Sequence, residues 1–92
     1  MQISGLNRTS FSGYLIAMVE DKKHPRICDK KVSINTDNIL KITKSFDESH
    51  ILLNDGAEHT ILHPLGKGEE KYQNLLNAYT AACQNPFINI QV

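Results

Sequence analysis

The sequence has no tryptophan, only two cysteines, and no apolar run long enough to cross a membrane. Cys28 and Cys83 lie far apart and outside any CxxC spacing, which favours free thiols of a reducing compartment over a disulfide framework. Polar residues follow Met1, so the start does not have the pattern of a secretory signal. We therefore expect a cytoplasmic protein that does not bind a membrane.

An excess of one charge is also absent, since ten Lys and Arg residues balance ten Asp and Glu residues. This balance argues against the basic character that is typical of nucleic-acid-binding domains. The charges are nevertheless unevenly distributed: residues 1–46 carry a net +4 and residues 47–92 a net −4. Such an asymmetry can orient a partner, unless folding interleaves the two halves and cancels the field.

The length of 92 residues predicts a single domain that spans residues 1–92. A domain of this size leaves few residues for an elaborate active site. A small binding or regulatory module is therefore favoured over an enzyme.

The clearest local pattern is Asp55-Gly56, which lies between the apolar segments Ile51–Leu53 and His59–Leu62. It predicts a β-hairpin with a two-residue turn, in which both central residues need positive φ. That register pairs Leu53 with Glu58 and would make His50 and His59 diagonal neighbours on one face.

Further strands are predicted on both sides of this hairpin. The opening residues through Ser12 favour a short strand or a loop, and the apolar run Tyr14–Val19 predicts a strand that is buried on both faces. Alternation over Val32–Asn35 predicts a half-buried strand, and Asn35–Asn38 a turn or bulge before a strand over Ile39–Thr43.

After Pro64 the pattern predicts a helix that begins at Glu69-Glu70, where acids favour the positive end of the helix dipole, and ends at Asn85-Pro86. A final strand follows, in which apolar and polar residues alternate. The fold class is therefore α+β: a small antiparallel sheet of about five strands, packed against one C-terminal helix and followed by a final short strand. The apolar face of the helix comprises Tyr72, Leu75, Leu76, Tyr79 and Cys83.

Few residues suggest chemistry. Gly66-Lys67-Gly68 lacks the spacing of a phosphate loop, and no nucleophile-elbow motif is present. His59 and His63 would lie about 13 Å apart along one strand, too far to share a metal ion. We predict no catalytic residue, no metal and no cofactor. A metal-dependent enzyme, or a thiol enzyme that uses Cys28 beside its basic neighbours, is a minor alternative.

Two sets of charged residues are the candidates for partner binding. The basic loop 22–31, with Lys41 and Lys44 nearby, could bind phosphates, or could simply be a solvated loop. Acids around the hairpin could bind a basic protein, or could only keep the turns solvated. The basic set is Lys22, Lys23, Arg26, Lys30 and Lys31, and the acidic set is Asp47, Glu48, Asp55 and Glu58.

The segments Asn35–Ile42 and Ile51–Gly56, with the strand to Leu62, resemble small flagellar proteins of the FlbD type. They are similar, more loosely, to the β-rich DNA-binding domains of LytTR response regulators. The resemblance covers a third to a half of the chain, and it implies a fold type together with a regulatory or binding role.

These observations lead to one functional prediction and one alternative. The leading prediction is a non-enzymatic protein-binding module that acts as a regulator, adaptor or inhibitor. A partner strand, or a second copy of the chain, could bind at an exposed sheet edge and give a homodimer. The alternative is a nucleic-acid-binding protein that uses residues 22–31.

Overall fold

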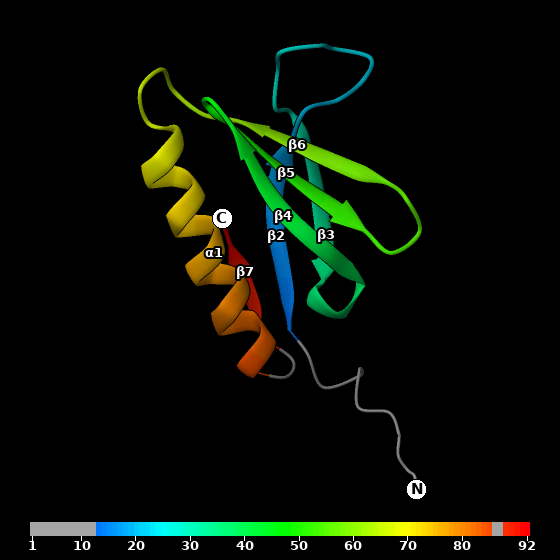
Figure 1. Ribbon diagram of the computed structural model, residues 1–92. Coiled ribbons are helices and arrows are strands. Elements are labelled where there is room, and N and C mark those ends of the chain that lie inside the picture. Colours follow the sequence, from blue (N-terminus) through cyan, green and yellow to red (C-terminus); the bar gives the residue numbers. More distant parts are fainter. Residues whose placement is uncertain (1–12, 86–87) are drawn as a thin grey trace, which may run out of the picture.

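The chain folds into two small β-sheets with one long helix beside them (Figure 1). This computed structural model describes residues 13–85 and 88–92, so the predicted strand or loop through Ser12 lies outside the described residues. The elements, in chain order, are β2 (Tyr14–Val19), β3 (Lys30–Asn35), the 3-10 turn η2 (Thr36–Asn38), β4 (Ile39–Ser45), β5 (Glu48–Leu53), β6 (Glu58–Leu62), α1 (Gly68–Gln84) and β7 (Asn89–Gln91).

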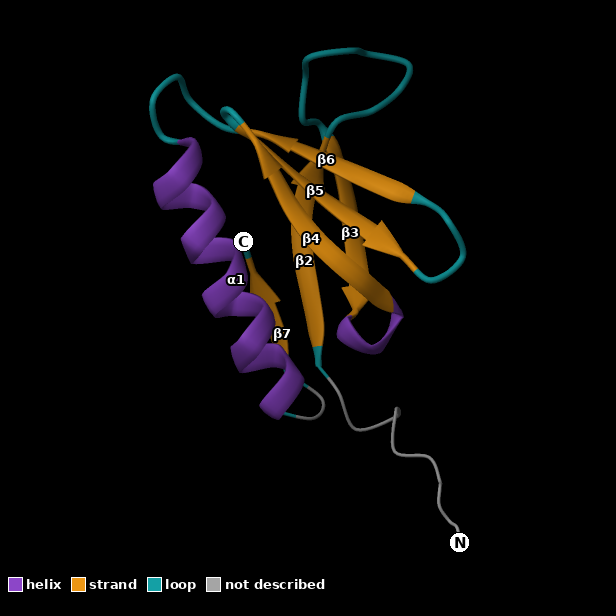
Figure 2. Ribbon diagram, in the orientation of Figure 1, coloured by secondary structure: helices purple, strands orange, loops and turns teal. Residues whose placement is uncertain are grey.

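The strands divide equally between the sheets, in the orders β3-β2-β7 and β4-β5-β6 (Figure 2). All neighbours are antiparallel except β7, which lies parallel to β2. The sheets meet where the Glu20 N–H, just after β2, donates a 2.8 Å hydrogen bond to the Thr60 carbonyl of β6. The predicted α+β class, the single helix and the closing strand are confirmed, with the antiparallel strands in two sheets rather than one.

The division between the sheets follows from η2, which separates β3 from β4. Asn35 begins this turn, and its side chain accepts a 2.8 Å hydrogen bond from the Asp37 N–H. A register shift between Ile39 and Lys41 then bends the start of β4. The turn or bulge predicted at this segment is confirmed, and it sends β4 away from β3 instead of alongside it.

Strand β2 has the predicted bounds but not the predicted burial. Leu15, Ala17 and Val19 are completely buried, whereas Tyr14 and Met18 on the other face remain 38% and 39% exposed. The prediction of burial on both faces is therefore wrong. The helix covers only the face that carries Leu15, and Ile39 and Ile51 of the second sheet pack on that same side.

The hairpin between β5 and β6 forms at the predicted place with a different turn. Only Gly56 has positive φ (+92°), and the Gly56 N–H donates to the Leu53 carbonyl. This geometry matches a type I turn closed by a left-handed glycine, which needs one such residue rather than two. The register therefore moves by one residue and sets His59 opposite Ile51, so His50 and His59 lie on opposite faces and the predicted neighbour relation is wrong.

Helix α1 closes the core of the protein. Its residues Leu75 and Ala82 pack with Leu15, Ile34, Ile39 and Ile51 in one buried cluster. Tyr72 and Tyr79 are partly buried as predicted, but Cys83 is exposed because the small Ala82 side chain, one position earlier, faces the sheets. The Tyr72 hydroxyl also donates to the Ile42 carbonyl of β4 at 3.2 Å, which joins the helix to the second sheet.

Candidate functional site

Three connecting segments lie at one end of the molecule, at the top of Figure 1. They are the loop 20–29 between β2 and β3, the tight turn at Phe46-Asp47 between β4 and β5, and the loop 63–67 that leads into α1. Residues from all three line a shallow hollow of about 300 Å³, which we call the tip hollow. Its lining residues are Arg26, Phe46, Asp47, Glu48, Leu62, His63 and Leu65.

Asp47 joins two of these segments. Its carboxylate accepts hydrogen bonds from the N–H groups of Gly66 and Gly68, each at 3.0 Å, and its carbonyl accepts one from the His63 N–H. The bonds from Gly66 and Gly68 hold the pKa of Asp47 below its usual value of 3.8, and the charges of Lys44 and His63 add to this effect. Because Lys67 makes no side-chain cap of its own, Asp47 caps the first turn of α1 from another part of the chain.

Gly68 allows this close approach. A Cβ atom at position 68 would lie 2.3 Å from the Phe46 carbonyl oxygen and 2.8 Å from the Asp47 Cα. Only glycine therefore fits here without moving the turn. The contact fixes Phe46 directly beside the start of the helix.

Phe46 and Leu65 are the two most exposed large apolar side chains of the described residues, at 89% and 94%. Phe46 also has a φ of 54°, in the left-handed region that disfavours a bulky residue. Arg26, across the tip hollow, has a φ of 71°. In residues 13–85 and 88–92 no other non-glycine residue has positive φ, so both strained positions line one site.

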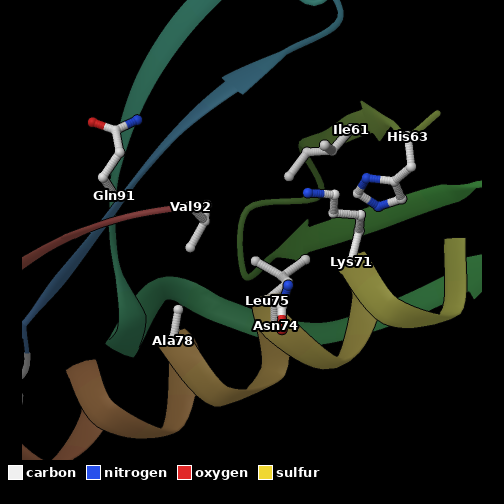
Figure 3. A pocket seen from close by; sticks show the side chains of 8 residues that line it. All are labelled: Ile61, His63, Lys71, Asn74, Leu75, Ala78, Gln91 and Val92. Atoms are coloured by element: carbon white, nitrogen blue, oxygen red, sulfur yellow. The ribbon is translucent and has the colours of Figure 1, made fainter. Parts of the chain in front are cut away.

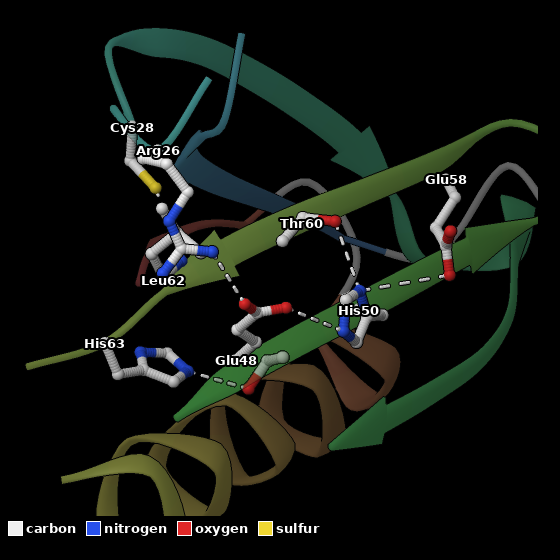
Figure 4. Close-up of polar contacts among 9 residues, drawn as sticks. Arg26, Cys28, Glu48, His50, Glu58, Thr60, Leu62 and His63 are labelled. Carbon is white, nitrogen blue, oxygen red and sulfur yellow. Dashed lines mark hydrogen bonds and ion pairs between the residues drawn. The ribbon is translucent and has the colours of Figure 1, made fainter. Parts of the chain in front are cut away.

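A network of charged groups continues from the tip hollow along the outer face of β5 and β6 (Figure 4). Glu48 lies between two cations or potential cations: Arg26 Nη1 at 3.0 Å and His50 Nε2 at 3.4 Å. The other ring nitrogen of His50 contacts the Thr60 hydroxyl at 3.1 Å and lies 4.0 Å from Glu58. The contact with Glu48 holds the Arg26 side chain against the sheet, and Arg26 also lines the tip hollow.

His63 lines the tip hollow and contacts β5 through Ser49. Its Nε2 lies 2.7 Å from the hydroxyl of Ser49. Burial lowers the pKa of His63, the charge of Lys71 lowers it further, and Asp47 opposes the shift. Because Ser49 is completely buried, this pair holds β6 against β5 and does not present a hydroxyl to a substrate.

The predicted basic residues separate into two groups. Arg26 is paired with Glu48, whereas Lys22, Lys23, Lys30 and Lys31 are exposed and form no ion pair with any residue that the structure describes. Three of these lysines, Lys22, Lys23 and Lys30, line a cleft of about 600 Å³, together with the acids Glu20, Asp21 and Glu58. Folding thus brings Glu58, from the acidic half of the sequence, close to lysines of the basic half.

The four predicted acids have local partners. Asp47 caps α1, and Asp55 accepts a 2.9 Å hydrogen bond from the Ala57 N–H within the hairpin turn. Glu48 pairs with Arg26 and lies 3.4 Å from His50, and a Glu58 oxygen lies 4.0 Å from His50 Nδ1. They do not form one acidic surface, since Asp47 and Asp55 lie at opposite ends of β5.

Cys28, Cys83 and His24 are further groups that could react or bind a metal ion. Cys28 and Cys83 are free thiols, and the Cys28 sulfur accepts a hydrogen bond from the Leu62 N–H at 3.3 Å. His24 Nδ1 lies 3.7 Å from a carboxylate oxygen of Asp21 and 3.6 Å from one of Asp29. This exposed group has ligand atoms that could approach one cation, although the sequence pattern did not single it out.

The sequence did not point to Phe46 or Leu65. The one available signal was an apolar residue inside a polar turn: Phe46 stands between Ser45 and Asp47, and Leu65 between Pro64 and Gly66. Such positions normally carry polar residues or glycine. Their proximity could not be foreseen, because it depends on the contact of Asp47 with Gly66 and Gly68.

Comparisons of the chain with protein-family models, with curated proteins and with solved structures give no match. The resemblance to FlbD-type and LytTR-type proteins therefore stays a prediction. In the part of the chain that the structure describes, no helix has the length and apolar character needed to cross a bilayer.

Proposed function

We propose that this protein is a small protein-binding module, acting as a regulator, adaptor or inhibitor, and that the tip hollow is its contact surface. The single observation that carries the proposal is the coincidence of strain and exposure at this hollow. Phe46 and Arg26 both adopt left-handed backbone conformations, and Phe46 and Leu65 are almost fully exposed.

The energetics favour a binding role for these side chains. A left-handed non-glycine residue costs about 1–2 kcal/mol, and strained positions of this kind cluster at functional sites. Phe46 contributes almost no buried apolar area that could offset the cost within the chain. A protein partner that buries the ring would recover it, because aromatic residues and arginine are the side chains that dominate binding energies at protein interfaces.

Site-specific photo-crosslinking in the native host tests this proposal. A benzophenone amino acid replaces Phe46 in one variant and Leu40, which is 62% exposed on β4 away from the tip, in a matched control. We expect a discrete crosslinked protein from position 46 that is absent from position 40 and is lost when Leu65→Asp is added. The same products from both positions, or none from position 46, would contradict the proposal.

A second candidate function is nucleic-acid binding through the cleft that Lys22, Lys23 and Lys30 line. The absence of ion pairs to these lysines in the described residues favours it, because their charges are available to phosphates. The acids in the same cleft weaken that field. In a gel-shift titration at low salt, Lys22→Ala with Lys23→Ala should abolish any shift, and no shift for the unaltered chain would exclude this function.

A further inference from the structure

A second hollow lies on another side of the molecule, between α1, the end of β6 and the last residues of the chain (Figure 3). We call it the helix groove; its volume is about 320 Å³. It lies at the low end of the volumes that small-molecule sites occupy, roughly 300–1,000 Å³. It shares only His63 with the tip hollow, so the two surfaces can be tested separately.

The walls of the helix groove are mostly apolar. Leu75 and Ala78 form the helix side, Ile61 the β6 side, and Val92 the side of the terminal strand. Figure 3 shows these side chains directed toward the same central space. Leu75 is also part of the buried core cluster, so the floor of the groove is held in place by the packing of the whole fold.

One cation stands at the end of this apolar space. The Lys71 side chain extends from α1 toward Ile61 (Figure 3). Lys71 forms no ion pair with any residue in the ranges 13–85 and 88–92, unlike Lys44 and Lys67, which pair with acids of the same helix. Asn74, one turn along the same edge, adds an amide that can donate a hydrogen bond.

Size and polarity together define the occupant. Since a water-sized group takes about 30 Å³ of liquid volume, the helix groove has room for roughly ten non-hydrogen atoms. An apolar body suits the walls of Ile61, Leu75, Ala78 and Val92, and an anionic head suits the unpaired ammonium group of Lys71. A neutral head would form no ion pair with that ammonium group, and a cationic head would be repelled by it.

We propose that the helix groove binds a small amphipathic carboxylate, with its hydrocarbon tail between α1 and Ile61 and its carboxylate at Lys71. This site is separate from the proposed protein-binding tip and uses neither Phe46 nor Leu65. Octanoate, with eight carbons and two oxygens, matches the room for roughly ten non-hydrogen atoms in the helix groove.

Titration with octanoate, followed by amide chemical shifts in NMR, tests the proposal. We expect saturable shifts at residues that line the helix groove and weaker binding of 1-octanol and octylamine at the same concentrations. Equal binding of all three compounds would show a nonspecific apolar contact and overturn the assignment of the head group. No saturable shift with octanoate would overturn the site itself.

Two variants separate charge from shape. Lys71→Met should weaken octanoate binding about two- to fivefold, the range for an exposed ion pair, while 1-octanol binding is unchanged. Lys22→Met, at another exposed lysine that lies outside the groove, serves as the matched control and should have no effect. Ala78→Phe should fill the groove and abolish binding.

Because Ala78→Phe could also disturb the packing of α1, its thermal unfolding is measured in parallel. If Ala78→Phe does not fold, Lys71→Met still tests the proposal, because Lys71 is exposed and its replacement should not disturb the packing. Unchanged octanoate affinity in Lys71→Met would contradict the proposed role of the lysine. Phe46→Ala should keep full octanoate binding, so a failure of the tip proposal leaves this one unaffected.

Discussion

The two turns at the ends of β5 each contain a residue with positive φ, but the two residues differ in type. The turn between β5 and β6 has Gly56 at φ +92°, where an added Cβ would meet no atom within 4 Å. Glycine is therefore favoured there only by the backbone conformation, and not by a lack of space. The turn between β4 and β5 has Phe46 at φ +54°, with its ring exposed. Glycine would fit the second backbone conformation at lower cost, so the Phe46 side chain requires an explanation other than the turn.

The two turns of this meander thus differ in how well the residue type fits the backbone conformation. At Gly56 the residue type and the backbone agree, which is the expected state of a turn that only connects strands. At Phe46 they disagree, and the disagreement lies beside Leu65 and Arg26 in the tip hollow. Departures of this kind are expected where a protein meets its partner.

Gly68→Ala should have the largest effect, because it removes the contact that holds the Phe46 turn against α1. The new Cβ would lie 2.3 Å from the Phe46 carbonyl oxygen and 2.8 Å from the Asp47 backbone. We expect a loss of about 1–3 kcal/mol in the free energy of unfolding, measured by urea denaturation. Gly66→Ala is the comparison for backbone strain without a clash, because a Cβ there meets nothing within 4 Å but φ is +79°. No loss of stability in Gly68→Ala would show that its contact with Phe46 is unimportant.

Gly56→Ala should come next, with a loss of about 1–2 kcal/mol in urea denaturation. Its only cause is the left-handed backbone, because the space around position 56 is open. Gly56→Asn should lose less, since asparagine tolerates this conformation better than alanine does. If alanine and asparagine are equally harmful, the backbone explanation is wrong.

Phe46→Gly should do the opposite and stabilise the protein, by about 0.5–1 kcal/mol. Relief of the left-handed conformation exceeds the extra chain entropy of glycine in the unfolded state. Phe46→Ala keeps the strained backbone and should leave the stability nearly unchanged, which separates the backbone from the ring. A loss of more than 1 kcal/mol in Phe46→Ala would mean that the ring supports the fold, and the contrast between the two turns would fail.

Asp47→Asn should give the smallest effect, a loss of stability that is present at neutral pH and disappears in acid. The pKa of Asp47 is lowered in the folded state, chiefly by the hydrogen bonds from Gly66 and Gly68. Its contribution to stability is therefore complete above the unfolded value near 3.8 and is lost as the pH falls through the lower folded value.

Urea midpoints measured from pH 5 to pH 2 check this dependence. The unaltered chain should lose stability more steeply than Asp47→Asn in this window. Glu70→Gln, in the exposed first turn of α1, controls for the removal of one acid. Identical slopes for the unaltered chain and Asp47→Asn would contradict the capping role.

The sequence predicted the positions of the helix and the strands better than it predicted which strands pair and in what register. The bounds of β2 and the position of α1 follow from local apolar patterns, and η2 follows from the turn residues at Asn35–Asn38. The hairpin register was missed because a turn with one left-handed residue and a turn with two share the same Asp-Gly signal. The parallel pairing of β7 with β2 could not be seen either, because a three-residue strand carries no information about its direction.

The candidate site was harder to predict than the fold. Charge patterns pointed to Arg26, Asp47 and Glu48, and these residues do line the tip hollow. The apolar residues Phe46 and Leu65 were missed, because exposure depends on how three distant loops meet. The pairing of Arg26 with Glu48, 22 residues later, likewise exists only in the folded chain.

The parallel pairing of β7 with β2 has a consequence for the order of folding. Tyr14 lies beside Asn89, so this contact closes a loop of about 75 residues, whereas β4, β5 and β6 pair through short turns. Loop closure on this scale is slow, and we expect the β4–β6 meander to form before the edge of β2 is covered. During that interval the Tyr14–Val19 strand, the most apolar of the described strands, presents an open edge to other nascent chains. Rapid docking of α1 and β7 then becomes the step that protects it from aggregation.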